Sequence, residues 1–129
     1  MLEPALKKVI PSELNSFNKL TKGRTPYYFT AWDEIEGVSI LRYWFWNKTK
    51  TKKNKKRVFV SEIETLLKHM QSADKITRGD YRQSCPRTNG DGTCGFAVII
   101  WILEYFQVVK IVDDEYHAKR GELIKQLLA

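Results

Sequence analysis

The stretch VSILRYWFWNKTKTKKNKKRVFV, residues 38–60, decides how the first half of the chain folds. Val38–Trp46 is rich in β-branched and aromatic residues, which favour a strand. Arg57–Val60 ends in a second apolar run and is expected to pair back on that strand. The sequence therefore predicts a long-looped β-hairpin whose connection is polar.

The polar run is also the most basic segment of the protein. Asn47–Arg57 contains seven of the 22 Lys and Arg residues, and the formal net charge of the whole chain is +7. The rest of the chain is therefore formally neutral. Many charge runs are only solvated loops, but concentrated cations are also typical of a phosphate-binding surface. We expect seven side chains to contact a phosphate backbone: Lys48, Lys50, Lys52, Lys53, Lys55, Lys56 and Arg57.

Length and composition indicate a folded protein of one domain. The chain has 129 residues, of which 43% are hydrophobic, enough for a core of its own. The most apolar stretch, Phe96–Val112, is interrupted by charged and polar residues and is too short to span a bilayer. The first residues do not resemble a secretory signal. We therefore expect an intracellular location, in the cytoplasm, nucleoid or nucleus, and no membrane contact.

Ahead of the hairpin the sequence predicts a short helix and a brief strand. Ser12 follows Pro11 and fits an N-cap, and the apolar residues after it keep near-helical spacing until Gly23. Tyr27–Thr30 is expected to form a strand and Asp33–Gly37 a turn.

After the hairpin, two capping-box patterns predict helix starts. Ser61 and Glu64 form the first, and the apolar residues after it place one helix face in the core and Glu62 on the other. Thr77 and Asp80 form the second, which predicts a short helix from about residue 78 to residue 84.

The last third of the chain reads as a helix, two strands and a helix. A third helix is expected over Cys94–Phe106, two short strands over Val108–Val112 and Tyr116–Lys119, and a terminal helix over Gly121–Leu128.

This order of elements resembles that of the winged helix-turn-helix superfamily over about residues 58–128. The resemblance implies a DNA-binding module in which the third helix enters the major groove and the two-stranded wing, with Lys119 and Arg120, contacts the DNA. The expected fold class is therefore α+β. Residues 1–57 would supply an N-terminal helix and the basic hairpin, and residues 58–129 a winged-helix-like part of the same domain.

The third helix departs from a reading helix because Glu104 is its only charged residue. Base edges are read by polar and charged side chains, and a helix that is apolar all round usually lies in a core. We therefore expect DNA contact to come from the hairpin and from a second set of cations on and after the second helix: Arg78, Arg82 and Arg87.

A different interpretation starts from DGTCGF, residues 91–96, which resembles the nucleophile segment of ovarian-tumour-type and related viral papain-like cysteine proteases. That resemblance implies Cys94 as a nucleophile acidified by a helix N-terminus. A histidine base is also needed, and His117 is the only histidine after Cys94. Alternatively, Asn89–Gly92 is a turn and Cys94 a small residue under a helix cap.

The two cysteines allow free thiols or a disulfide. An intracellular location favours free thiols, and a Cys85–Cys94 bridge would close a ten-residue loop. The two Cys and two His are too far apart in sequence for a typical zinc site. We expect no metal, no cofactor and no catalytic residue.

The sequence thus predicts a non-catalytic nucleic-acid-binding module, with DNA favoured over RNA, that acts mainly through phosphate contacts. It would be a DNA-binding regulator or the recognition module of a larger DNA-processing protein. The aromatic residues beside the lysines, such as Trp44 and Trp46, are core residues, a base-stacking surface or a protein-binding patch. A winged-helix module that binds a protein partner or a second copy, and a cysteine protease, remain the alternatives.

Overall fold

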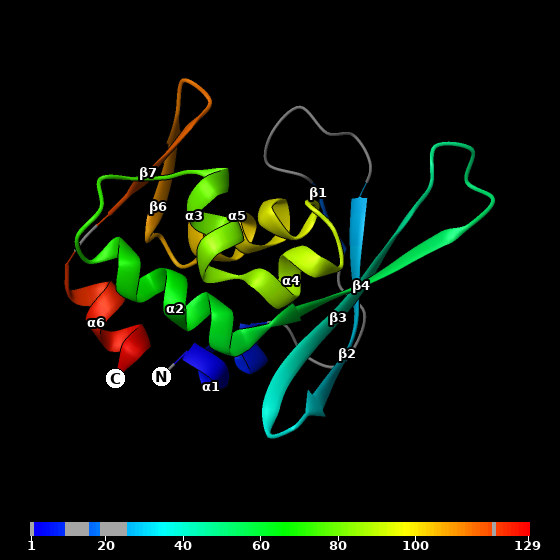
Figure 1. Ribbon diagram of the computed structural model, residues 1–129, viewed down its shortest axis with the longest axis horizontal. Coiled ribbons are helices and arrows are strands. Elements are labelled where there is room, and N and C mark those ends of the chain that lie inside the picture. The colour runs from blue at the N-terminus through cyan, green and yellow to red at the C-terminus, as the bar shows by residue number, and fades with distance from the viewer. Residues whose placement is uncertain (1, 10–15, 19–25, 120) are drawn as a thin grey trace.

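The computed structural model describes residues 2–9, 16–18, 26–119 and 121–129 (Figure 1). Across these residues the fold is α+β, with six helices and two antiparallel sheets, which confirms the expected class. The helices are α1 (Leu2–Val9), α2 (Val60–Met70), α3 (Arg78–Ser84), α4 (Pro86–Gly90), α5 (Gly95–Tyr105) and α6 (Glu122–Leu128). The strands are β1 (Ser16–Asn18), β2 (Pro26–Ile35), β3 (Val38–Trp46), β4 (Lys53–Phe59), β5 (Lys75–Ile76), β6 (Val109–Val112) and β7 (Glu115–Ala118).

The larger sheet has the strand order β1-β2-β3-β4 and contains the predicted hairpin. β4 begins at Lys53, four residues earlier than expected, so much of the basic run lies in a strand and only residues 47–52 form the connection. The hairpin projects from the body of helices, with its connection farthest from them, at the right of Figure 1.

β2 is longer than the predicted strand, and the turn after it is shorter than predicted. Asp33–Gly37 was expected to be a turn, but β2 continues to Ile35 and only Glu36 and Gly37 connect it to β3. Both residues have positive φ, 51° and 81°, as the central residues of a tight type I′ hairpin do.

The smaller sheet has the order β5-β7-β6 and contains the two short strands predicted near the C-terminus. β6 and β7 match the expected strands to within one residue, and Asp113 and Asp114 connect them with φ of 50° and 62°. β5, which precedes α3 and pairs with β7, was not predicted because its two residues are too short for a periodic pattern.

The capping box at Thr77 is confirmed. Its hydroxyl accepts the Asp80 N–H at 3.1 Å, and the Asp80 carboxylate accepts the Thr77 N–H at 2.8 Å. α3 therefore has the predicted bounds. α5 and α6 are also confirmed to within one residue at either end.

The capping box predicted at Ser61 is wrong. β4 ends at Phe59 and α2 begins at Val60, so no loop residue remains to cap the helix, and Phe59 takes the N-cap position without a side-chain hydrogen bond. Glu62, expected on the exposed face, is only 7% exposed. Its carboxylate is satisfied because it accepts hydrogen bonds from the Thr88 N–H and hydroxyl, both at 2.7 Å.

The predicted N-terminal helix is also corrected. Ser12 and residues 19–23 lie outside the described residues, but Ser16–Asn18 is strand β1, paired with β2 from Pro26 to Tyr28. Strand pairing overrides the weak helical spacing of this segment. Among the described residues before β2 the helix is α1, which the sequence analysis missed, and it buries Leu2 and Leu6, one turn apart.

The core lies between one face of the larger sheet and the helices. Tyr27, Phe29, Leu41 and Tyr43 of β2 and β3 are buried in the same cluster as the apolar face of α2. α5 has seven of its eleven residues buried, as its uniformly apolar sequence predicted. No helix in the described ranges is both long enough and apolar enough to cross a bilayer.

Candidate nucleic-acid interface

Strand register places cations and aromatic rings together on one face of the hairpin. Trp44 is the partner of Lys55, and Trp46 is the partner of Lys53. Successive side chains of a strand point to opposite faces, so Tyr43, buried in the core, leaves Trp44 on the other side of the sheet. We call this side of the hairpin the basic face, formed by Arg42, Trp44, Trp46, Lys53, Lys55 and Arg57.

The rings of the basic face pack against one another and against a lysine. Tyr28 of β2 stacks on Trp44 with ring centroids 4.5 Å apart, and Trp46 meets Trp44 edge to face at 5.1 Å. Lys53 Nζ lies 4.5 Å from the Trp44 ring centroid and 5.7 Å from that of Trp46. Both Trp side chains remain partly exposed. They are therefore accessible aromatic surface beside cations.

The connection between β3 and β4 is held in shape by Asn47. Its side-chain oxygen accepts hydrogen bonds from the backbone N–H groups of Thr51, at 2.9 Å, and Lys52, at 3.3 Å. Lys48, Lys50 and Lys52 are all exposed. The loop thus presents three cations from an ordered backbone.

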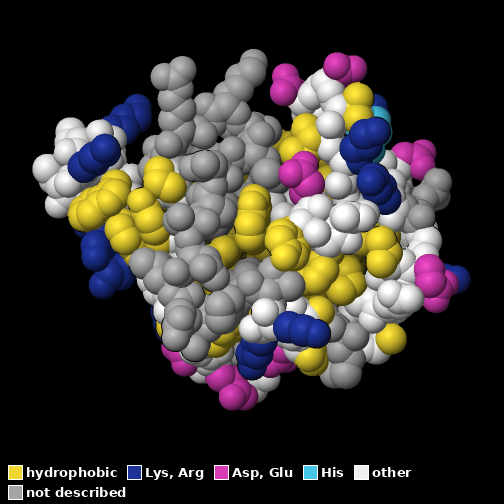
Figure 2. All heavy atoms as spheres, turned by 180° about the vertical axis from the view of Figure 1, so that it is seen from behind, with side chains coloured by type: hydrophobic (Ala, Val, Ile, Leu, Met, Phe, Trp, Pro, Cys, Tyr) yellow, Lys and Arg dark blue, Asp and Glu magenta, His cyan; other side chains and the backbone are white. Residues whose placement is uncertain are grey.

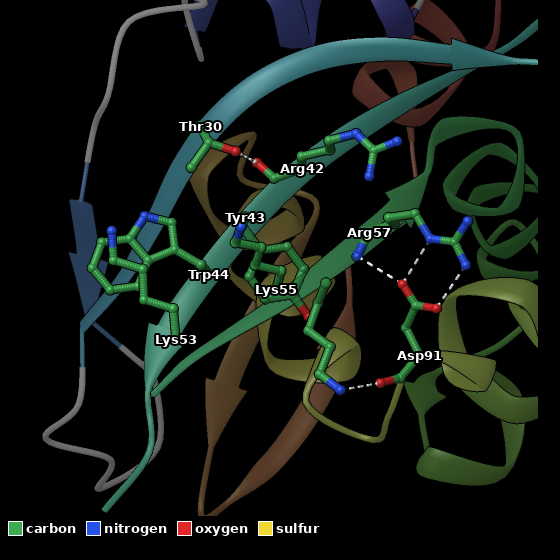
Figure 3. Close-up of a pocket in the computed structure, with 9 residues that line it drawn as sticks. Thr30, Arg42, Tyr43, Trp44, Lys53, Lys55, Arg57 and Asp91 are labelled. Atoms are coloured by element: carbon green, nitrogen blue, oxygen red, sulfur yellow. Dashed lines mark hydrogen bonds and ion pairs between the residues drawn. The ribbon is translucent and has the colours of Figure 1, made fainter. Parts of the chain in front are cut away.

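At the base of the hairpin, Asp91 joins β4 to the end of α4. Arg57 donates three hydrogen bonds to its carboxylate, from the backbone N at 2.9 Å, from Nε at 2.9 Å and from Nη2 at 2.8 Å (Figure 3). Lys56 Nζ donates to the Asp91 backbone oxygen at 2.6 Å. The Arg57 hydrogen bonds lower the pKa of Asp91, and the same pair raises the pKa of Arg57. We call this set of contacts the Asp91 clamp.

A second arginine of the basic face has its own acid. Arg42 is the Cα partner of Arg57, so two like charges stand opposite one another. Asp33 accepts hydrogen bonds from Arg42 Nε at 2.9 Å and Nη2 at 2.8 Å. Each arginine is therefore neutralised by a separate aspartate, and the remaining cationic character of this face comes from lysines.

A pocket of about 650 Å³ opens between these groups. Figure 3 shows Trp44 and Lys53 along one side of it and Arg57 with Asp91 along the other. Small-molecule sites commonly measure about 300–1,000 Å³. The basic face is therefore hollowed and can receive a planar, anionic group.

The structure divides the seven predicted phosphate contacts into two groups. Arg57 and Lys56 are engaged by the Asp91 clamp. Among the described residues, no ion pair involves the other five, which we call the free lysines: Lys48, Lys50, Lys52, Lys53 and Lys55.

Only part of the second cationic set lies near the hairpin. The guanidinium groups of Arg87 and Arg57 lie 4.1 Å and 5.3 Å from the Phe59 ring centroid, so Arg87 adjoins the hairpin base. Arg78 instead packs 4.9 Å from the Phe96 ring, near the smaller sheet.

The remaining arginine of that set and the cations predicted on the wing lie elsewhere or are not described. Arg82 on α3 and Lys119 after β7 are exposed, and Arg120 lies outside the described residues. In Figure 1 the β6–β7 hairpin and the β3–β4 connection project from different parts of the molecule. The two hairpins therefore do not form one continuous described surface.

The described side-chain partner of Cys94 is a tyrosine. Its Sγ lies 3.4 Å from the Tyr43 hydroxyl, and burial raises the pKa of Tyr43 well above its ordinary value, so the phenol stays protonated. The two histidines of the chain contact carboxylates instead, at 3.2 Å for His69 and 3.6 Å for His117. Cys94 thus has a neutral phenol, not an imidazole, as its described partner.

The residues around Cys94 have structural roles of their own. Gly92 has φ of +140°, which other residues rarely adopt, and its carbonyl accepts a hydrogen bond from the Tyr81 hydroxyl at 3.1 Å. A Cβ added at Gly95 would lie 2.5 Å from that hydroxyl. Backbone conformation therefore accounts for Gly92, close packing for Gly95, and the Asp91 clamp for the aspartate.

The disulfide between Cys85 and Cys94 is not formed. Both thiols are free, and Cys85 Sγ donates to the Glu62 carbonyl at 3.5 Å while Cys94 contacts Tyr43. Asn89 and Gly90, which one interpretation of the sequence placed in a turn, instead form the end of helix α4, whose first turn contains Pro86.

Sequence reasoning missed the Asp91 clamp and the Tyr28–Trp44 stack. The two-residue alternation of Val38–Trp46 could have placed Trp44 and Trp46 on one face. No local pattern could have paired Asp91 with Arg57, because 34 residues separate them.

Comparisons of the chain with protein-family models, with curated proteins and with solved structures give no match.

Proposed function

We propose that this protein is a non-catalytic nucleic-acid-binding module that holds a phosphate backbone with its β3–β4 hairpin. The observation that carries the proposal is the set of five free lysines on a hairpin that projects from the helices. Each lysine that meets a phosphate releases condensed counterions, which supplies affinity without base contacts. The Asp91 clamp supports this function mechanically, since it fixes the base of the projecting strand.

We further propose that residues 58–129 form a winged-helix-like part and that the preferred nucleic acid is DNA. The strand order β5-β7-β6, with β5 between α2 and α3, supports this assignment together with the order of helices. α5 takes the place of the reading helix but is largely buried, so the proposed contacts come from the hairpin. An intracellular location remains part of this proposal.

The test compares two charge-matched triple variants. In the first, the loop lysines Lys48, Lys50 and Lys52 become Ser. In the control, three exposed lysines outside the hairpin become Ser: Lys8, Lys68 and Lys125. Both variants lose three positive charges, so a general effect of net charge is the same in both.

Binding of fluorescent DNA is measured by anisotropy at low salt. We expect the loop variant to lose affinity by at least tenfold and the control to stay within about threefold of the wild type. An equal loss of affinity in the two variants would mean that only net charge matters, which contradicts the proposal. Absence of DNA binding by the wild type would also contradict it.

A further inference from the structure

The aromatic part of the basic face carries an inference about the kind of strand that is bound. Trp44 and Trp46 are neighbours on the face that the core does not use, and both are partly exposed. Buried Tyr43 and half-buried Phe45, on the other face, already supply the core of this strand. Two large rings are thus left outside the core at the point where the free lysines begin.

Charge surrounds these rings on the hairpin. Lys53 and Lys55 are the strand partners of Trp46 and Trp44, and the three loop lysines follow directly. On the face seen in Figure 2, hydrophobic side chains likewise lie next to Lys and Arg at this projecting end, at the left of the view. A protein partner with an apolar surface would have to bury these ammonium groups, whereas a polyanion would neutralise them.

We infer that the basic face binds an unpaired stretch of DNA, with bases stacked on Trp44 and Trp46 and phosphates contacted by the free lysines. The inference rests on the proposed function and names its substrate class. Stacking requires a base face, and in a duplex those faces are covered by neighbouring base pairs. Single strands expose them, and aromatic side chains beside a cationic track are the usual means of holding such strands.

Lys53 covers the Trp44 ring in the free protein, and a bound base would have to replace it there. Its ammonium lies 4.5 Å from the centroid of the Trp44 ring, and both residues line the pocket, whereas Tyr28 is stacked on Trp44 from the neighbouring strand. A cation–π contact at an exposed site is weaker than a stacked base. An arriving phosphate draws the ammonium away, and the base takes its place on the indole.

The choice of DNA follows from the chemistry of the rings. Thymine carries a methyl group that uracil lacks, and apolar contact with that group favours DNA on an aromatic surface. The pocket of about 650 Å³ beside Trp44 is large enough for a base and part of its backbone.

The test uses the full chain and four probes of twelve nucleotides each. They are a single strand of thymidines, an abasic DNA strand with the same number of phosphates, a self-paired DNA hairpin with the same number of phosphates, and a single strand of uridines. The variants are Trp44→Leu and Trp46→Leu, each of which keeps one ring. Trp32→Leu is the matched control, because Trp32 lines a different pocket with Glu3 and Lys7. Affinities come from anisotropy of labelled probes.

We expect the wild type and the Trp32 variant to bind the thymidine strand more tightly than each of the other three probes. Each basic-face Trp variant should lose about 5-fold to 150-fold in affinity for the thymidine strand and little for the abasic one. Their salt dependence should stay that of the wild type. Should Trp→Leu unfold the hairpin, Trp44→Phe keeps a ring and is expected to retain most of the preference.

The failures of the two proposals can be told apart. Equal binding of thymidine and abasic strands by the wild type, or a preference that survives both Trp variants, overturns the stacking site while the phosphate contacts stand. Tighter binding of the uridine strand overturns the assignment to DNA. Absence of binding to all four probes overturns the proposed function itself.

Discussion

Replacing Asp91 with Asn tests whether the Asp91 clamp fixes the basic hairpin to the rest of the fold. The carboxylate accepts three hydrogen bonds from Arg57, and its side chain is 19% exposed while that of Arg57 is 36% exposed. Hydrogen bonds to charged groups contribute about 1.5–3 kcal/mol each. Asparagine keeps one acceptor oxygen and Arg57 is partly solvated, so we expect a loss of about 1–3 kcal/mol in the free energy of unfolding.

The assay is urea denaturation at pH 7, with Asp33→Asn as the matched control. Asp33 makes a similar ion pair with Arg42, but their side chains are 48% and 42% exposed, so its loss should cost less. The urea dependence of the unfolding free energy should be the same in all three proteins, because each unfolds the same surface.

The stabilisation by the Asp91 clamp should depend on pH, and the direction follows from the pKa of Asp91. Hydrogen bonding to Arg57 lowers the pKa of folded Asp91 below its unfolded value of about 3.9. The stabilisation is therefore fully present above about pH 5 and is lost as the pH falls through the lowered folded value. The difference between wild type and Asp91→Asn should therefore shrink steadily as the pH falls below that unfolded value. A difference in unfolding free energy that stays the same in acid would refute the reasoning. So would an equal loss of unfolding free energy in Asp33→Asn at pH 7.

Three shorter predictions concern the surroundings of the site. Gly95→Ala should destabilise the fold by about 1–3 kcal/mol, because its Cβ would lie 2.5 Å from the Tyr81 hydroxyl; an unchanged melting temperature would contradict this packing. Burial raises the pKa of Cys85 to about 12, so timed alkylation at pH 8 should leave this thiol unmodified until the protein unfolds. Thr77→Ala should cost about 1 kcal/mol in urea denaturation, because Asp80 N–H loses its acceptor; a neutral result would mean that the cap is not stabilising.

Local patterns in the sequence predicted most of the second half of the fold. The Thr77 capping box needs only residues three apart, so the bounds of α3 could be read directly. The same pattern at Ser61 failed because the helix start there depends on where β4 ends, which is decided by pairing with β3. Local signals hold where no strand competes for the same residues.

The candidate site could be predicted only in part. The charge of the basic run was evident, but which of its cations are already paired depends on Asp91, 34 residues away from Arg57. The alternation of β3 implies that Trp44 and Trp46 share a face, whereas packing of Tyr43 against the helices decides that this face is the open one. Long-range contacts therefore determine which cations of the hairpin lack an acidic partner and which of its aromatic rings lie outside the core.

The salt dependence of DNA binding tests the central claim most directly. If the five free lysines contact phosphates of a single strand, the logarithm of the association constant should fall against the logarithm of salt concentration with a slope of about −3.5. Replacing all five with Ser should bring that slope close to zero. A slope near zero in the wild type, or the same slope in wild type and variant, would contradict the account.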